Sequence, residues 1–66
     1  MSLVVCQYFY YRYANLASKA ERMANYKLAE ELWLKAGEYV FCDVDIEWTS
    51  RRIAFCRRQS LRNDIS

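Results

Sequence analysis

Residues 26–40 read YKLAEELWLKAGEYV, and this stretch decides the fold. Within it, apolar residues recur at offsets of 0, 3, 7, 10 and 14, at Tyr26, Ala29, Trp33, Ala36 and Val40. Residues at this spacing lie along one side of an α-helix, which predicts a helix with an apolar stripe. Because small residues alternate with large ones in the stripe, we expect another helix to pack closely against it.

The segments on both sides of this stretch continue the helical pattern. The preceding segment contains good helix formers and no helix breaker. Its apolar residues recur at helical spacing, at Tyr13, Leu16, Ala17, Ala20 and Ala24. The following segment carries Trp48, Phe55 and Cys56. The whole chain is therefore predicted to be helical, and its main feature is apolar surface suited to helix packing.

Three helices are expected, over about residues 8–23, 27–41 and 44–61. The start of the first one stays open, because the β-branched and aromatic residues between 4 and 13 also allow a strand. Asn25 separates the first two helices, since Asn accepts the left-handed conformation that ends a helix and its side chain can cap the next one.

The third expected helix is acidic at its start and basic in its later half. Asp43 and Asp45 offer N-cap carboxylates, and Glu47 falls in the first turn. Three arginines form a line along this helix, at Arg51, Arg58 and Arg62. Three explanations of that line stay open: cations placed at a helix C-terminus, contact with an acidic patch on a protein partner, and contact with DNA.

Four residues of the first two expected helices have the spacing of one tetratricopeptide unit, at Ala17, Ala29, Trp33 and Ala36. Arrays of this repeat need about three units, and only one is present. The sequence therefore predicts an all-α, three-helix domain over residues 1–66, a helical hairpin of tetratricopeptide-like spacing closed by the basic third helix. We assign three aromatic residues to its core, Trp33, Trp48 and Phe55.

The composition indicates a small folded protein whose stability would increase on binding another chain. The chain has 66 residues, of which 55% are hydrophobic and 17% aromatic. A chain of this length buries only roughly 60% of its unfolded surface, which makes a single core marginal. We therefore expect a homodimer or a partner-bound protein. The formal net charge of +2 is too small to indicate direct nucleic acid binding.

The sequence does not favour an enzyme, a cofactor site or a metal site. It contains no His and no Gly-rich phosphate loop, and its three cysteines lack C-x-x-C spacing. We expect Cys6, Cys42 and Cys56 to be small buried hydrophobes. With no signal-peptide pattern and no apolar run of about 20 residues, the expected location is the cytoplasm, away from any membrane.

Three sequence blocks carry a resemblance to a known family. They are Ala17-Ser18-Lys19-Ala20-Glu21, then Tyr26-x-x-Ala29-x-x-x-Trp33-x-x-Ala36, and Glu47-Trp48-x-x-x-Arg52-x-x-Phe55-Cys56-x-Arg58. Together they resemble the AraC negative regulator (ANR) family, very small helical proteins of enteric pathogens. The resemblance covers about residues 13–58. The chain departs from the family pattern at Asn25, where a Gly is expected, and at Ala20-Glu21, where a leucine–glutamate pair is expected.

The resemblance implies a small negative transcriptional regulator that binds an AraC-type activator and blocks its dimerisation or its DNA binding. Virulence and colonisation genes are the implied targets. The chain also resembles PerC-like transcriptional activators, at Tyr26, Ala29, Trp33, Arg51, Arg52 and Cys56. That alternative implies an activator or a DNA-associated protein that uses the basic third helix. We prefer the negative regulator because Ala36, Trp48 and Phe55-Cys56 fit it better.

The expected partner surface has two parts. The first is the side of the second helix that lies off the packed stripe, with Leu28, Leu32, Lys35 and Tyr39. The second is the arginine line of the third helix, with Arg51, Arg58 and Arg62. Leucines and a tyrosine that share a helix side are typical of a helical contact surface. The resemblance implies that the partner bound there is an AraC-type activator.

Overall fold

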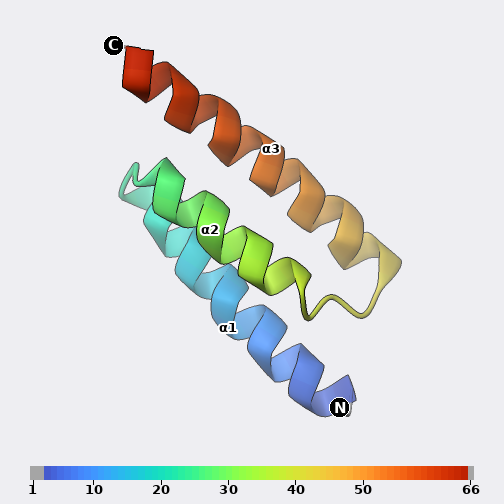
Figure 1. Ribbon diagram of the computed structural model, residues 1–66. Helices are drawn as coiled ribbons and strands as arrows, with labels where there is room; N and C mark the ends of the chain where they lie inside the picture. Colours follow the sequence, from blue (N-terminus) through green and yellow to red (C-terminus); the bar gives the residue numbers. More distant parts are fainter. Residues whose placement is uncertain (1–2, 66) are drawn as a thin grey trace.

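The computed structural model describes the backbone of residues 3–65 and the side chains of residues 4–62. These residues form three helices, α1 (Leu3–Arg22), α2 (Tyr26–Gly37) and α3 (Asp43–Ile65) (Figure 1). No strand occurs between residues 3 and 65, so the predicted all-α, three-helix fold is confirmed. None of these helices is both long enough and apolar enough to span a membrane.

The helix bounds differ from the expected ones. α1 begins at Leu3 instead of near residue 8, because Cys6, Tyr10 and Tyr13 place partly or fully buried side chains at helical spacing. This tertiary packing outweighs the β propensity of the segment. α3 begins at Asp43 and continues to Ile65, beyond the expected end near residue 61.

α2 ends at Gly37, four residues before the expected end. The N–H groups of Glu38 and Tyr39 donate to the carbonyls of Lys35 and Ala36, three residues back, at 3.1 and 3.0 Å. These bonds tighten the last turn, and the chain then leaves the helix axis. The turn lets the Tyr39 ring stack on α1, where its centroid lies 6.0 Å from that of Tyr13.

In the turn between α1 and α2, Ala24 and Asn25 have roles that differ in part from those expected from the sequence. Ala24 has a φ of 60°, so it adopts the left-handed conformation expected for Asn25. The N–H of Asn25 donates to the Ala20 carbonyl at 2.9 Å, and that of Ala24 donates to Glu21 at 2.9 Å, as in a Schellman motif. Asn25 is the N-cap of α2, and its side chain accepts a hydrogen bond from the Leu28 N–H at 3.5 Å. The predicted capping role of Asn25 is thereby confirmed.

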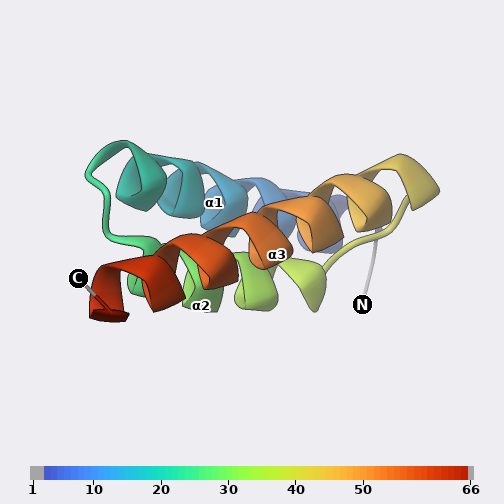
Figure 2. The ribbon, with the colours of Figure 1, turned by 90° about the horizontal axis from the view of Figure 1, so that it is seen from above.

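The three helices form an elongated molecule with extents of 44 × 19 × 15 Å. α1 and α2 run antiparallel, and α3 runs antiparallel to α2 (Figure 1). α3 crosses obliquely over the α1–α2 pair, with its first half toward α1 and its second half over α2 (Figure 2). α2 therefore packs along both other helices, whereas α1 and α3 meet mainly through long side chains.

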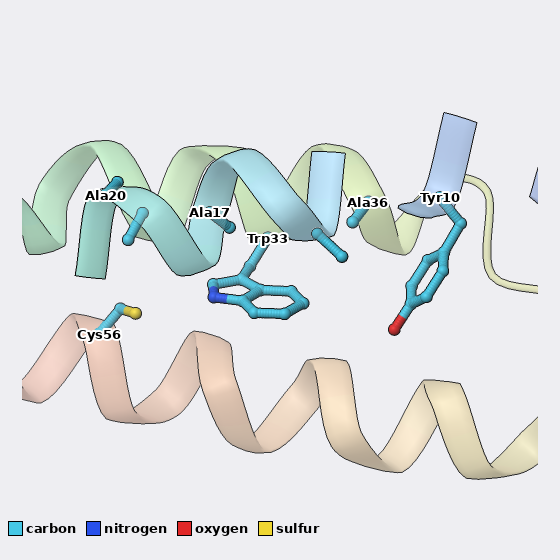
Figure 3. Packing of buried hydrophobic residues seen from close by; sticks show 8 residues of the cluster. Tyr10, Ala17, Ala20, Trp33, Ala36 and Cys56 are labelled. Atoms are coloured by element: carbon cyan, nitrogen blue, oxygen red, sulfur yellow. The ribbon is translucent and has the colours of Figure 1, made fainter. Parts of the chain in front are cut away.

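The hydrophobic core is small and rich in alanine. Its buried members are Tyr10, Ala14, Ala17, Ala20, Ala29, Trp33, Ala36 and Cys56. Alanines from α1 and α2 face each other, which lets the two helices approach closely. The Trp33 ring leaves α2 and fills the space between the hairpin and α3 (Figure 3). The predicted stripe is confirmed at Ala29, Trp33 and Ala36.

The core prediction was wrong for Trp48 and incomplete for Phe55. Trp48 is 51% exposed, and Phe55 is only partly buried. Among residues 43–62, the buried positions of α3 are Thr49 and Cys56, which lie seven residues apart on one side of the helix. Trp48 precedes Thr49 and is rotated from it by about 100°, so its ring lies at the edge of the helix interface. Sequence spacing alone did not identify which side of α3 faces the hairpin.

Candidate protein-binding groove between α1 and α3

An open groove of about 700 Å³ lies between α1 and α3. α1 contributes Asn15, Ser18, Glu21 and Arg22; α2 contributes Tyr26 and Trp33; α3 contributes Trp48, Arg52 and Phe55. The oblique course of α3 separates its middle from α1 and creates the groove. Because residues of α2 also line the groove, the groove forms only when all three helices are packed together.

Trp33 contributes to the base of the groove and is anchored there by a hydrogen bond. Its indole Nε1–H donates to Glu21 Oε2 at 2.6 Å. The Trp33 side chain is only 2% exposed. A buried indole N–H needs a partner, because leaving it unpaired costs about 1–3 kcal/mol. Glu21 satisfies this requirement from the neighbouring helix.

An ion pair crosses the groove from α1 to α3. The Arg52 guanidinium donates to both carboxylate oxygens of Glu21, through Nη2 to Oε1 and through Nε to Oε2 at 3.3 Å. The two side chains are 12% exposed for Glu21 and 26% for Arg52, so water screens this pair less than a surface pair. The Glu21 carboxylate of α1 therefore accepts hydrogen bonds from Trp33 of α2 and from Arg52 of α3, and so links all three helices.

The α3 wall of the groove is aromatic. The Arg52 guanidinium carbon lies 4.4 Å from the centroid of the Phe55 ring and 5.6 Å from that of the Trp48 ring. Phe55 in turn packs edge-to-face against Tyr26 of α2, with centroids 5.9 Å apart. Cation–π contacts of this kind hold a guanidinium in place and leave ring surface exposed. Trp48 is therefore a large, half-exposed aromatic side chain whose ring contacts an arginine that is itself held in place.

The groove offers a surface for contact with another molecule. Its charged pair is already satisfied internally, and its remaining surface combines aromatic rings with polar side chains. The side chains that the structure describes include no cluster of His, Cys, Asp or Glu able to hold a metal ion. Cys56 is buried, and burial raises the pKa of its thiol, which suppresses the nucleophilic thiolate. Such a surface is suited to holding an apolar or aromatic side chain of a partner.

The structure does not place the predicted α2 contact residues on one exposed surface. Leu28 is 42% exposed, and Lys35 is exposed and lies 3.7 Å from Glu38. Leu32 and Tyr39, in contrast, are partly buried and pack against the core. Tyr39 also stacks on Phe9, with centroids 5.2 Å apart. The expectation of an unpartnered leucine–tyrosine face was wrong, because this side of α2 borders α1.

The three predicted arginines lie on the exposed side of α3. Arg51 donates to Glu47 on the same helix at 2.5 Å. Arg58 and Arg62 are exposed and form no ion pair with any residue in the described part of the chain. Arg57, which was not singled out, pairs with Glu30 of α2 at 2.7 Å. The predicted arginines thus share a surface, and that surface is separate from the predicted α2 residues.

Sequence reasoning missed Glu21 and Arg52 as partners. One signal was present: Glu21 follows Ala14 and Ala17 at helical spacing, so its carboxylate enters a buried face. Arg52 follows Thr49 by three residues on the inner side of α3. An acid and a base that both occupy inward positions of different helices are expected to pair, since each is costly to bury alone.

The groove and the motif blocks are the features from which a function can be assigned. Comparison with protein-family models, curated proteins and solved structures finds no match to this chain. The side chains that meet in the groove include Glu21, Trp33, Trp48, Arg52 and Phe55, and all five fall within the blocks quoted above. The residues that carry the resemblance and the residues that build the groove therefore overlap.

Proposed function

We propose that this protein is a small negative transcriptional regulator that binds an AraC-type activator and prevents its dimerisation or its DNA binding. The observation that carries the proposal is the half-exposed Trp48 ring at the open groove between α1 and α3. The resemblance to the ANR family supplies the class of partner. The protein would act in the cytoplasm by occupying a surface of the activator, without chemistry.

The groove supports a helical segment as the bound element. Two helices that run in the same direction border it, and a third helix can lie between such neighbours with its apolar side inward. Trp48 would serve as the anchor, because Trp is enriched among the few residues that dominate binding energy. Arg52 would limit rearrangement of the wall, since it is already held by Glu21 and Phe55.

Direct DNA binding is the alternative, and the charge arrangement favours it less. α3 begins with Asp43 and Asp45 and carries Glu47 in its second turn, so phosphates would meet acidic groups along the same helix. A net charge of +2 also offers few cations for phosphate contacts. Arg58 and Arg62 are the residues on which a DNA-associated, PerC-like role would depend.

The test is co-expression of the protein with an AraC-type activator encoded by the same genome, followed by co-purification and a promoter-DNA shift assay. We expect the activator to co-purify and its DNA shift to be lost. Trp48→Ala should abolish both effects. Leu34→Ala, which removes an α2 side chain of similar exposure at 46%, is the matched control and should preserve them.

The outcomes separate the two functions. If Trp48→Ala behaves like the unaltered protein, the groove is not the activator-binding site. If the small protein alone shifts promoter DNA in a salt-sensitive manner and does not capture the activator, the DNA-associated function replaces the proposed one. In that case Arg58→Ala and Arg62→Ala should weaken the shift, because each removes a phosphate contact.

A further inference from the structure

α3 carries a row of residues that shares Trp48 and Phe55 with the groove and continues beyond the groove in both directions. Six of its residues are spaced by 4, 3, 4, 3 and 4 positions, Val44, Trp48, Arg51, Phe55, Arg58 and Arg62. This is the spacing of the contact positions in a two-stranded coiled coil. All of these side chains are exposed except Phe55, which is partly buried. We call these six residues the α3 seam.

The seam combines apolar residues and arginines in an order that favours self-association. Its apolar members are Val44, Trp48 and Phe55, and its arginines are Arg51, Arg58 and Arg62. When two seams are placed antiparallel about residue 53, each apolar residue of one copy lies opposite an arginine of the other. The facing pairs are Val44 with Arg62, Trp48 with Arg58, and Phe55 with Arg51. A parallel arrangement would instead place each arginine opposite itself.

The charges that flank the seam also favour the antiparallel arrangement. Asp43 and Glu47 are exposed near the start of α3, whereas Arg58 and Arg62 lie near its end. Asp43, Arg58 and Arg62 have no ion-pair partner among the side chains of residues 4–62. In an antiparallel pair the acidic start of each α3 lies beside the basic end of the other. The exposed acidic and basic side chains can therefore form ion pairs at both ends of the interface.

We propose that a second copy of this chain docks on the α3 seam and forms an antiparallel, two-fold symmetric dimer. Trp48 and Phe55 already accept the Arg52 guanidinium within the chain, at 5.6 and 4.4 Å, so their rings suit cation–π contacts. Arg58 and Arg51 of the second copy supply such contacts from the opposite side. The same surface meets itself, as a two-fold interface requires.

The dimer does not depend on the proposed regulatory function. Arg58, Arg62 and Val44 belong to the seam but do not line the groove. Substitutions at these three residues therefore test self-association without removing the groove residues Trp48 and Arg52. Loss of the dimer with activator binding retained, or the reverse, identifies which proposal has failed.

The first experiment measures the molar mass of the purified chain by light scattering over a range of concentrations. We expect twice the chain mass of 8.0 kDa. The double variant Arg58→Glu, Arg62→Glu should raise the dimer dissociation constant at least about tenfold, because acidic groups would then face Asp43 and Glu47. The matched control Lys19→Glu, Lys27→Glu makes the same charge change on exposed residues of α1 and α2 and should leave the mass unchanged.

The second experiment tests the register and does not depend on a charge change. Val44 is 73% exposed and Arg62 is exposed, so cysteine at either position should leave the fold intact. In the antiparallel dimer, Val44→Cys of one copy faces Arg62→Cys of the other and should form a disulfide on mild copper–phenanthroline oxidation. Each variant alone should remain uncrosslinked, because equivalent positions lie roughly 27 Å apart along the axis.

A mixture of the two single-cysteine variants that yields a crosslinked dimer, with none from either variant alone or from the unaltered chain, supports the proposal. Crosslinking of each single variant with itself would indicate a parallel pair and overturn it. A chain that stays at 8.0 kDa at all concentrations, or a dimer that both experiments leave unaffected, also overturns it. Circular dichroism of each variant establishes that the helices are retained.

Discussion

The indole N–H of Trp33 donates to Glu21 at 2.6 Å, and this one bond ties the centre of α2 to the end of α1 beneath the groove. Trp33 is the only tryptophan in the core, since Trp48 is half exposed on the groove wall. Two residues of the same type thus occupy opposite environments in one small chain. Trp33 stabilises the fold, whereas Trp48 is available to a partner.

Trp33→Ala and Trp48→Ala should therefore differ sharply in stability. Trp33→Ala leaves a large cavity and should lower the free energy of unfolding by about 3–5 kcal/mol. Trp48→Ala should lower it by less than about 1.5 kcal/mol, because half of the ring is already in water. Urea denaturation followed by circular dichroism measures both values. Equal losses in the two variants would contradict the assignment of Trp48 to the surface.

Removal of Arg52 should cost more than a surface ion pair is worth. Arg52→Ala leaves the Glu21 carboxylate, 12% exposed, without its cation, and should lower the free energy of unfolding by about 2–4 kcal/mol. Glu21→Gln in the Arg52→Ala background should recover part of that loss, since it removes the stranded charge. A double-mutant cycle in urea measures the coupling, and strictly additive effects would show that the two side chains act independently.

The hydrogen bond between Tyr10 and Thr49 joins α1 to the start of α3. Tyr10 Oη and Thr49 Oγ1 lie 3.0 Å apart, and both side chains are buried. Tyr10→Phe should lower the free energy of unfolding by about 1 kcal/mol. Thr49→Val should cost a similar amount, and the double variant little more than either, because both remove the same bond. A doubled loss in the double variant would show that each hydroxyl has another role.

Stability should fall in alkaline solution through Tyr10 and Cys56. Burial raises the pKa of the Tyr10 hydroxyl above its ordinary value of 10.0 and the pKa of the Cys56 thiol above 9.0. The folded chain therefore holds these protons more tightly than the unfolded chain. Their contribution is fully present below the ordinary values and is lost as pH rises through the raised ones.

Urea unfolding at several pH values between about 8 and 11 tests this dependence. Tyr10→Phe should reduce the slope of stability against pH in the upper part of that range, because phenylalanine does not ionise. Leu34→Ala is the control, since Leu34 does not ionise and is 46% exposed, and it should leave the slope unchanged. An identical slope in all three proteins would exclude Tyr10 as a source of the pH dependence.

Ala24→Gly should stabilise the turn between α1 and α2. Ala24 has a φ of 60°, which an L residue with a Cβ adopts at a cost of roughly 1 kcal/mol and which Gly adopts freely. We expect a gain of about 0.5–1 kcal/mol in the free energy of unfolding. Ala54→Gly, at an exposed position inside α3, should instead lose about 1 kcal/mol. A loss in both variants would mean that the strain at Ala24 is offset elsewhere.

The helical fold could be predicted because its signals are local. The spacing of Ala29, Trp33 and Ala36 identified the buried stripe of α2, and Asn25 identified the turn. The failures concern long-range packing. Leu32 and Tyr39 looked free because the sequence does not show that α1 borders that side of α2. The end of α2 moved for the same reason, since the contacts of Tyr39 with α1 decide where the chain leaves α2.

The groove was only partly predictable. Trp48, Arg52 and Phe55 recur at helical spacing, so periodicity alone places them on one side of a helix. Whether that side faces inward or outward depends on the crossing of α3 over the hairpin, which no local pattern determines. The bond between Glu21 and Arg52 depends on the same crossing. It joins residues 31 positions apart, so helix periodicity could place each residue on an inner side but could not show that the two meet.

The alanine contact between α1 and α2 has a genetic consequence. A change of the first or second base of an alanine codon produces Gly, Ser, Thr, Pro, Val, Asp or Glu, and every one of these except Gly adds atoms. Ala17, Ala29 and Ala36 are fully enclosed, so an added atom forces the two helices apart, while Gly weakens the helix itself. No amino-acid substitution that one base change produces at these codons is therefore neutral, and a mutational scan should find its deepest intolerance at the smallest side chains of the protein.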